Sequence, residues 1–171
     1  MYFLTTLQQN IYLAPIYLNK DYKNFCLSSL LATVEGKKIS SFGIVIIVLE
    51  FNKDFKNGKF LPGSSSALFL LKYKALTLKI FKGEILDAIV TNITKLGFFC
   101  EMGMVQIFVA KQFIPSSYFY NSKSNNFICK RLKRKISSEI IIRIRIIGVR
   151  DNCDHSQAIG SIKESNLGPL D

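Results

Sequence analysis

The stretch FKGEILDAIVTNITKLGFFCEMG, residues 81–103, decides the fold class of the second half of this chain. Its β-branched and apolar residues predict a strand over 84–93, and the Lys-Leu-Gly turn predicts a second strand over 97–101. Three further short β segments follow, at 105–110, 140–149 and 157–162. Five short strands with one long connection are typical of a small closed barrel of the OB type. Such barrels use the faces of their second and third strands to bind nucleic acid.

The first half of the chain mixes strand patterns with one helix pattern. Short strand pieces are predicted at 2–4 and 11–13, ahead of Pro15. Apolar runs at 42–51 and 67–78 predict two longer strands. The run at 42–51 lacks strict alternation, which predicts burial on both of its faces.

A helix is predicted to begin near Asn19 or Asp21 and to end at Gly36. Asn and Asp are favoured as helix N-caps, and Gly is favoured just after the last turn. Apolar residues recur at every fourth position between these limits, at Tyr22, Cys26, Leu30 and Val34. Together with the strands, this helix forms an α+β pattern in which the helix covers one face of a small sheet.

The charge of the chain is basic throughout. The length of 171 residues suits one ordinary domain or two small ones, and the net charge is +11. Residues 1–80 have ten Lys against four acids, and residues 81–171 have thirteen Lys and Arg against eight acids. Both halves would therefore attract polyanions, which indicates a nucleic acid or an acidic protein as partner. Solvated lysines and a compositional bias explain the same excess equally well.

The cysteine and hydropathy patterns indicate a soluble intracellular protein. The four cysteines are far apart without a CxxC pair, and the chain has a single histidine, so a zinc site of familiar spacing is not expected. No signal peptide opens the sequence, and the longest apolar runs are strand-sized, far shorter than a membrane span. We expect reduced thiols, no membrane association and no metal or cofactor.

No set of residues with the spacing of a catalytic site is present. Cys153 and His155 are close in sequence, but an exposed turn histidine is the ordinary interpretation of this segment. The Pro-Gly-Ser stretch at 62–66 lacks the lysine of a phosphate-binding loop. We therefore expect a non-catalytic protein.

The adjacent phenylalanines Phe98 and Phe99 are the first binding candidates. Successive residues of a strand point to opposite faces, so one ring should point inward and the other outward. Phe108 on the next strand could lie beside the outward ring, and Lys95 and Lys111 flank the pair. Two exposed rings on neighbouring strands form a platform on which bases stack, with lysines placed to meet phosphates. The alternative is that both phenylalanines belong to the core.

Two basic segments are the second binding candidates. The long polar connection at 115–138 is predicted to be a loop, and it contains a cationic run made of Lys130, Arg131, Lys133, Arg134 and Lys135. This run could line a nucleic-acid groove, act as a nuclear-import signal, or only keep the loop soluble. Arg143 and Arg145 alternate with isoleucines and should form a basic stripe on one barrel face.

Several ordered motifs span essentially the whole chain: MYFLTTLQQNIYLAPIYL at 1–18, VEGKKISSFGIVIIV at 34–48, NGKFLPG at 57–63, LKYKALTLKIFKGEILDAIVTNITKLGFFCEMG at 71–103, IPSSYFY at 114–120, IRIRIIGVR at 142–150 and AIGSIKESNLG at 158–168. In this order they resemble the family of the seventh subunit of eukaryotic RNA polymerase II, the stalk subunit, which has an archaeal counterpart.

The resemblance implies two domains. Residues 1–80 would be a truncated ribonucleoprotein-like α+β domain that docks on the polymerase core, and residues 81–171 would be an OB barrel of the ribosomal-protein-S-one type that binds RNA. The tip loop of the docking domain would consist of Asn57, Gly58, Lys59, Phe60, Leu61, Pro62 and Gly63. By residue correspondence, Phe99 and Phe108 would face nucleic acid and Phe98 would belong to the core.

The resemblance also implies partners and a location. The chain would form a heterodimer with the fourth subunit, join the core subunits of RNA polymerase II, act in initiation and bind nascent single-stranded RNA. It would work in the nucleus, or in another genome-bearing compartment of a reduced eukaryote, and it would carry out no catalysis. The alternatives are the equivalent subunit of RNA polymerase III or of an archaeal polymerase, and a free-standing RNA-binding protein with the same barrel.

Overall fold

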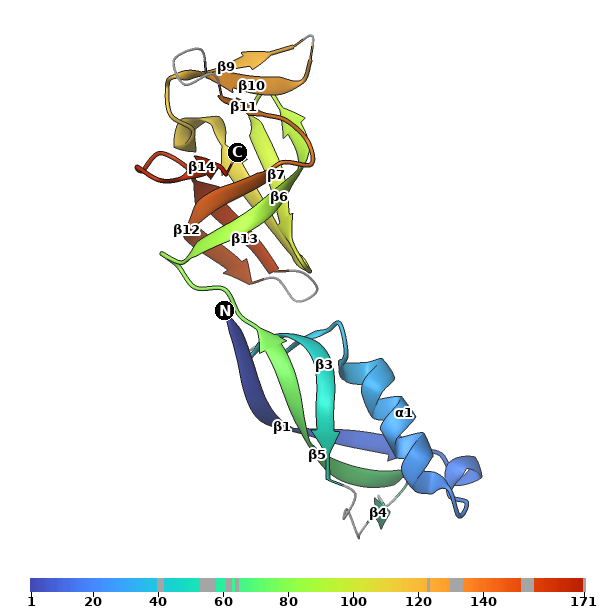
Figure 1. The fold of residues 1–171 in the computed structure, drawn as a ribbon. Coiled ribbons are helices and arrows are strands. Elements are labelled where there is room, and N and C mark those ends of the chain that lie inside the picture. The colour runs from blue at the N-terminus through green and yellow to red at the C-terminus, as the bar shows by residue number, and fades with distance from the viewer. Residues whose placement is uncertain are drawn as a thin grey trace. The chain divides into compact units, whose positions relative to one another are not determined.

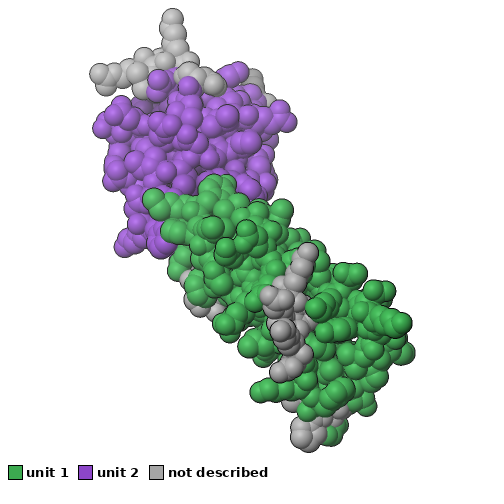
Figure 2. All heavy atoms as spheres, turned by 60° about the horizontal axis from the view of Figure 1, so that its bottom comes forward, with its two compact units in different colours: residues 1–79 green, residues 80–171 purple. Residues whose placement is uncertain are grey.

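The computed structural model divides the chain into two compact units, residues 1–79 and 80–171 (Figure 2). It describes residues 1–39, 42–52, 58–60, 63, 65–122, 124–129, 134–151 and 156–170, without the side chains of Asp151 and Ser156. Each unit has its own core and is described by itself.

The first unit is an antiparallel sheet with one helix on it (Figure 1). The strands follow the order β1-β5-β3-β2, with β4 also paired to β5. The elements are β1 (Tyr2–Leu13), the 3-10 turn η1 (Pro15–Tyr17), α1 (Tyr22–Val34), β2 (Lys38–Ile39), β3 (Gly43–Phe51), β4 (Lys59–Phe60) and β5 (Ala67–Leu78). The predicted α+β class is therefore confirmed.

Helix α1 lies on one face of this sheet because its apolar stripe matches the helical period. The stripe residues Cys26, Leu30 and Val34 are buried and pack with sheet residues such as Leu7 and Phe69. Asp21 is the N-cap residue, and Gly36, just beyond the last turn, has a φ of 73°, which glycine adopts without strain. The sequence prediction for this helix is confirmed.

The prediction of two separate strand pieces at the N-terminus is wrong. Residues 2–13 form one continuous strand whose register with β5 runs from Tyr2 opposite Leu78 to Leu13 opposite Ala67. The polar residues in the middle of β1 hide the strand in the sequence. Thr6, Gln8 and Asn10 are exposed and point away from the helix, while Leu7 and Ile11 are buried and point toward it. The partly buried Gln9 lies on the same face as these two and interrupts the apolar pattern. A twelve-residue antiparallel partner keeps this strand extended.

The prediction that residues 42–51 are buried on both faces is also wrong. The first three residues of β3 are buried, but Ile47 and Leu49 are 45% and 54% exposed. Helix α1 covers only one face of the sheet, and β3 shifts register twice against β5, so apolar residues in its second half reach solvent.

The second unit is a closed five-stranded barrel with a small sheet added to it (Figure 1). The barrel strands follow the order β13-β8-β7-β6-β12, and pairing of β12 with β13 closes the ring. The β8–β13 pair is parallel, as in an OB fold, and the predicted OB barrel is confirmed. The barrel elements are β6 (Ile85–Thr94), β7 (Gly97–Met102), β8 (Val105–Ala110), β12 (Ile141–Asp151) and β13 (Ser156–Ser161), with β14 (Gly168–Pro169) paired to β12.

Inward-facing residues alternate along the barrel strands and fill its interior. Phe98, Ile107, Ile144 and their neighbours are fully buried. Gly97 begins β7 at a φ of 150°, and a Cβ there would lie 2.1 Å from the Val109 carbonyl oxygen. Only glycine therefore allows the β6–β7 turn to approach β8 so closely.

The long polar segment after β8 is not the loop predicted from the sequence. After the turn η2 (Lys111–Phe113) it forms a three-stranded antiparallel sheet of β9 (Tyr118–Asn121), β10 (Asn126–Cys129) and β11 (Arg134–Ile136). Phe127, Cys129 and Ile136 are buried, and the Phe127 ring meets the Phe98 ring edge-on at 6.3 Å. The small sheet therefore covers one end of the barrel. Three short, mostly polar strands carry too little periodicity to be recognised in the sequence.

Candidate nucleic-acid interface

Phe99 and Phe108 form an aromatic pair on the outer wall of the barrel. Antiparallel pairing of β7 with β8 places them directly opposite each other, and their ring centroids are 4.7 Å apart at an interplanar angle of 41°. Both rings are partly exposed, whereas the preceding Phe98 is completely buried. The strand alternation predicted for the two adjacent phenylalanines is confirmed, with Phe98 as the inward ring.

A pocket of about 270 Å³ opens beside this pair. The parallel register sets Ile159 of β13 beside Phe108, and Gln157 beside Gln106 of β8. The pocket is lined by both rings and by Gln106, Arg150, Gln157 and Ile159. An apolar floor with amides and a guanidinium at its edge suits a flat base that carries hydrogen-bonding groups and an attached phosphate.

Sequence reasoning missed Gln106, Arg150, Gln157 and Ile159 among these residues. Gln106 is on β8 itself, whereas Arg150, Gln157 and Ile159 come from the last two barrel strands, far from the aromatic pair along the chain. Only the closure of the barrel brings them to β8, and the parallel β8–β13 register has no local signal in the sequence.

Lys95 and Lys111 lie at the barrel end where the β6–β7 turn meets the end of β8. The Lys111 amide donates a hydrogen bond of 2.8 Å to the Leu96 carbonyl oxygen, so the two segments are held together. Both lysines are exposed, and Leu96, which follows Lys95 in the turn, is 76% exposed. Their role beside the aromatic pair and their contact with phosphates stay predictions.

The predicted basic stripe on β12 is neutralised by carboxylates. Arg143 Nε and Nη2 donate to Asp87 Oδ1 and Oδ2 at 2.7 and 2.9 Å, which makes a bidentate pair. Arg145 Nη1 lies 2.9 Å from Glu164 Oε2. These arginines line a different pocket, with Asp87 and Glu164, and the structure does not bring them to Phe99 and Phe108. The alternation of Arg and Ile along β12 carries no information about Asp87 and Glu164, which come from other segments of the chain.

The remaining predicted residues are only partly described. Of the cationic run, Arg134 and Lys135 lie on β11 and are exposed, while Lys130, Arg131 and Lys133 are outside the described residues. In the tip loop, Lys59 and Phe60 form β4 against β5, and the Phe60 side chain is 70% exposed. Gly58 and Gly63 are described, whereas Asn57, Leu61 and Pro62 are not.

The ion pair on β12 leads to a pH-dependent prediction. The hydrogen-bonded Arg143 guanidinium lowers the pKa of the Asp87 carboxyl below its ordinary value of 3.8. A lowered pKa means that the pair stabilises the fold above pH 3.8, and that this contribution is lost as the pH falls through the lowered pKa.

In Arg143→Gln, the Asp87 pKa should rise toward its ordinary value, measured by NMR titration of the side-chain carboxyl carbon. Arg145→Gln, which removes the partner of Glu164, should leave the Asp87 titration unchanged. An ordinary Asp87 pKa in the unmodified chain would contradict the ion pair.

The described part of the chain shows little that suggests reaction chemistry. Cys26, Cys100 and Cys129 are buried free thiols, and burial raises the pKa of Cys100 to about 12, which keeps it protonated and unreactive. Among the described residues, no three His, Cys, Asp or Glu side chains are grouped to hold a metal ion. Cys153 and His155 are outside the described residues. No helix in the described ranges is long and apolar enough to span a membrane.

Comparisons with known proteins agree with this architecture. The family model of the S1 RNA binding domain matches residues 79–148, which include the aromatic pair. DNA-directed RNA polymerase II subunit rpb7 of Dictyostelium discoideum is 37% identical over 99% of this chain and 99% of its own length. The RPB7 subunit of Saccharomyces cerevisiae is 34% identical over 99% of this chain and 100% of its own length. RNA polymerase II subunit 7 of Arabidopsis thaliana is also 34% identical, over 99% and 97% of the two chains.

These relatives cover the N-terminal unit as well as the barrel, so the likeness is not limited to a widespread RNA-binding module. They are named as polymerase subunits, which confirms the expectation of a non-catalytic chain. The ordered motifs, the two units and the near-complete matches together show that the chain belongs to the RPB7 family, the seventh subunits of DNA-directed RNA polymerase II.

Proposed function

We propose that this chain is the stalk subunit of a nuclear RNA polymerase II, acting in initiation and binding nascent single-stranded RNA through its barrel. The observation that supports the RNA-binding part is the partly exposed pair of Phe99 and Phe108, which lies beside a pocket and belongs to the region that matches the S1 RNA binding domain. The surface lies on the second and third barrel strands, the usual nucleic-acid face of OB folds.

The chemistry of this surface suits RNA without sequence preference. Each base presents a flat face to an aromatic ring, and such stacking contributes about 1–3 kcal/mol per base whatever the base is. Lys95 and Lys111 at the nearby barrel end, and Arg150 at the pocket, supply charge for phosphates. A transcript of any sequence could therefore pass along the same surface.

The docking part of the proposal concerns the first unit. We assign the tip loop around Phe60 to contact with the polymerase core, and we take the fourth subunit as the partner in a heterodimer. Phe60 is 70% exposed on the two-residue strand β4, so it offers an apolar side chain that a partner in the assembly could cover. The near-complete match to polymerase II subunits supports the same assignment.

Co-purification from native cells tests the assembly. The tagged chain should recover the large polymerase II subunits together with a small helical protein resembling the fourth subunit. The variant Phe60→Asp should recover less of the large subunits, because a charged side chain would replace the apolar tip contact. The variant Lys20→Asp, at an exposed site before α1, is the matched control and should recover the normal amount. Recovery of the chain alone, or with subunits of another polymerase, would disprove the proposed assignment.

A further inference from the structure

The small sheet β9–β11 carries an exposed aromatic ring that the proposed function has not used. Antiparallel register places Phe119 of β9, Ile128 of β10 and Lys135 of β11 in one cross-strand row. The Phe119 side chain is 60% exposed, Ile128 is partly exposed and Lys135 is exposed. The row therefore sets a flat apolar surface two strand spacings, about 10 Å, from a cation.

The Phe119 ring is exposed because it lies on the outer face of a sheet whose other face is buried. The strand that carries it is held in place by that buried face. The opposite face of the same sheet is anchored by Phe127, Cys129 and Ile136, which are at most 1% exposed. The turn between β9 and β10 is fixed by a 2.8 Å hydrogen bond from the Tyr120 hydroxyl to Asn125 Oδ1. Strand alternation then leaves Phe119 no inward position.

The charge of the sequence around Phe119 favours a polyanion over an apolar partner. Between Glu101 and Glu139 the chain has seven basic residues and no acidic one. The basic residues are Lys111, Lys123, Lys130, Arg131, Lys133, Arg134 and Lys135. An exposed ring within such a segment has the composition of a single-strand binding surface, in which bases stack on rings and cations follow the backbone.

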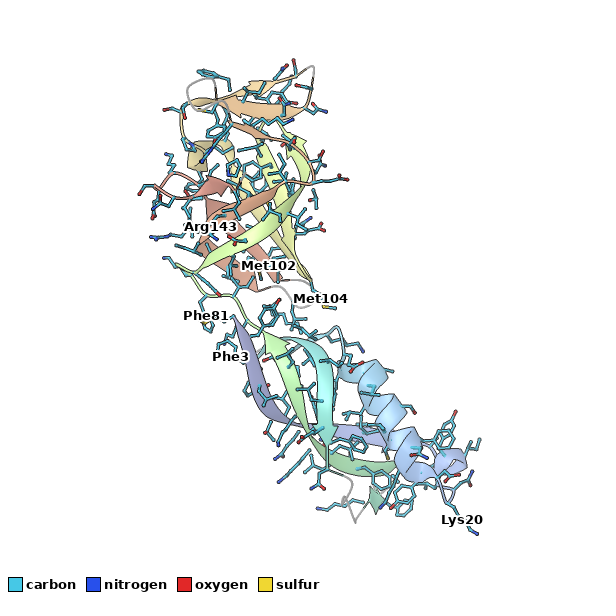
Figure 3. The ribbon with its side chains drawn as sticks, in the orientation of Figure 1. Phe3, Lys20, Phe81, Met102, Met104 and Arg143 are labelled. Atoms are coloured by element: carbon cyan, nitrogen blue, oxygen red, sulfur yellow. The ribbon has the colours of Figure 1, made fainter. Side chains whose placement is uncertain are left out.

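The small sheet also lies at the barrel end that an RNA strand would reach after passing the Phe99–Phe108 pair toward Lys111. It covers the end where β7 begins, since Phe127 contacts Phe98, and the turn η2 leads to it directly from Lys111. Met102 and Met104 mark the opposite end of β7 and β8 (Figure 3). A strand that leaves the Phe99–Phe108 pair toward Lys111 would therefore reach the small sheet next.

We propose that the outer face of β9–β11 is a second contact for single-stranded RNA, where one base stacks on Phe119 and the backbone meets Lys135, the cation of the same cross-strand row. The RNA strand bound at the Phe99–Phe108 pair would continue to this second contact. The inference rests on the proposed RNA-binding function. Because the two contacts lie in sequence along one strand, only RNA long enough to span both can use the second.

Fluorescence anisotropy of the full-length chain with two labelled oligouridylates tests this contact. The oligomers have about 5 and about 15 nucleotides, which are near the lower and upper ends of the range of OB-fold site sizes. Phe119→Ala should weaken binding of the longer RNA at least about fivefold, as expected for one lost base stack. It should leave the shorter RNA unchanged. Phe119→Trp should retain or improve the longer-RNA affinity. Tyr12→Ala is the matched control, since Tyr12 is a 59% exposed ring on strand β1.

The salt dependence tests the cationic part. Lys135→Gln should reduce the slope of log affinity against log salt by about 0.7 for the longer RNA, as expected for one lost phosphate contact on a single strand. Lys20→Gln, at an exposed site in the first unit, should leave the slope unchanged. An equal slope for Lys135→Gln and the unmodified chain would overturn the cationic part.

The outcomes separate this contact from the proposed function. If the unmodified chain binds neither oligomer, RNA binding by the barrel fails and the second contact fails with it. If the chain binds RNA and needs Phe99 and Phe108, but Phe119→Ala behaves as Tyr12→Ala does at both lengths, only the second contact is overturned. A loss that is equal for short and long RNA would also overturn it, because the two contacts would then not lie in sequence.

Discussion

Replacing Phe98 with Ala is expected to lower the free energy of unfolding by about 3–5 kcal/mol. The ring is completely buried between the barrel wall and the small sheet, where it meets Phe127 edge-on. Its removal takes away apolar contacts and leaves a cavity that the closed ring of strands can fill only in part. Since small domains are stable by about 5–15 kcal/mol in total, this loss is a large fraction of the stability of the barrel unit.

Urea denaturation followed by circular dichroism measures this effect, with Phe99→Ala as the matched control. Phe99 is the next residue in the chain and has the same side chain, but it points outward and is partly exposed. We expect its replacement to cost no more than about 1 kcal/mol, the typical cost of a substitution outside the core. Equal losses for the two variants would show that both rings belong to the core and would remove the basis of the RNA-binding surface.

The double replacement of Phe99 and Phe108 with Ala is expected to weaken RNA binding by at least about 2 kcal/mol, which is roughly 30-fold. Each ring contributes about 1–3 kcal/mol when a base stacks on it. The two rings touch, so their contributions are coupled and the two losses need not simply add. The expected loss is therefore set at the low end of the range, at about 1 kcal/mol for each ring. Anisotropy titration with the oligouridylate of about 5 nucleotides is the measurement, since that length stays within one OB-fold site.

The control for this variant is the double replacement of Tyr2 and Tyr12 with Ala. These are 62% and 59% exposed rings of the first unit, so the control removes a similar amount of exposed aromatic surface. Its RNA affinity should match that of the unmodified chain. The far-ultraviolet circular dichroism of the Phe99 and Phe108 variant should also be unchanged. A molten or insoluble double variant would mean that the rings serve the core, and an unchanged affinity would place RNA elsewhere.

Much of the architecture can be predicted from local sequence patterns. The four-residue repeat from Tyr22 to Val34 identifies α1, because a helix brings every fourth residue to one face. The turn before Gly97 identifies the β6–β7 hairpin, and alternation along β7 separates Phe98 from Phe99. These features depend only on residues that are near one another in the chain.

Features that depend on distant pairing are missed or predicted wrongly. The carboxylates of Asp87 and Glu164 neutralise Arg143 and Arg145, and neither acid can be assigned to its arginine from one strand's pattern. The polar centre of β1 looks like an interruption in the sequence, although its long pairing with β5 makes it continuous strand. The small sheet is hidden by its polar residues, although Phe127 anchors it to the barrel.

The sequence by itself determined the α+β class, the OB barrel, the family and the position of the aromatic pair. Each of these follows from short-range periodicity or from motifs that persist in order along the chain. Only the tertiary structure decided which residues share a surface. Barrel closure brings Arg150 and Ile159 to the aromatic pair, and it also pairs Arg143 with Asp87. The physical reason is that side-chain direction is set within a strand, whereas charge neutralisation and pocket lining are set by the register between strands.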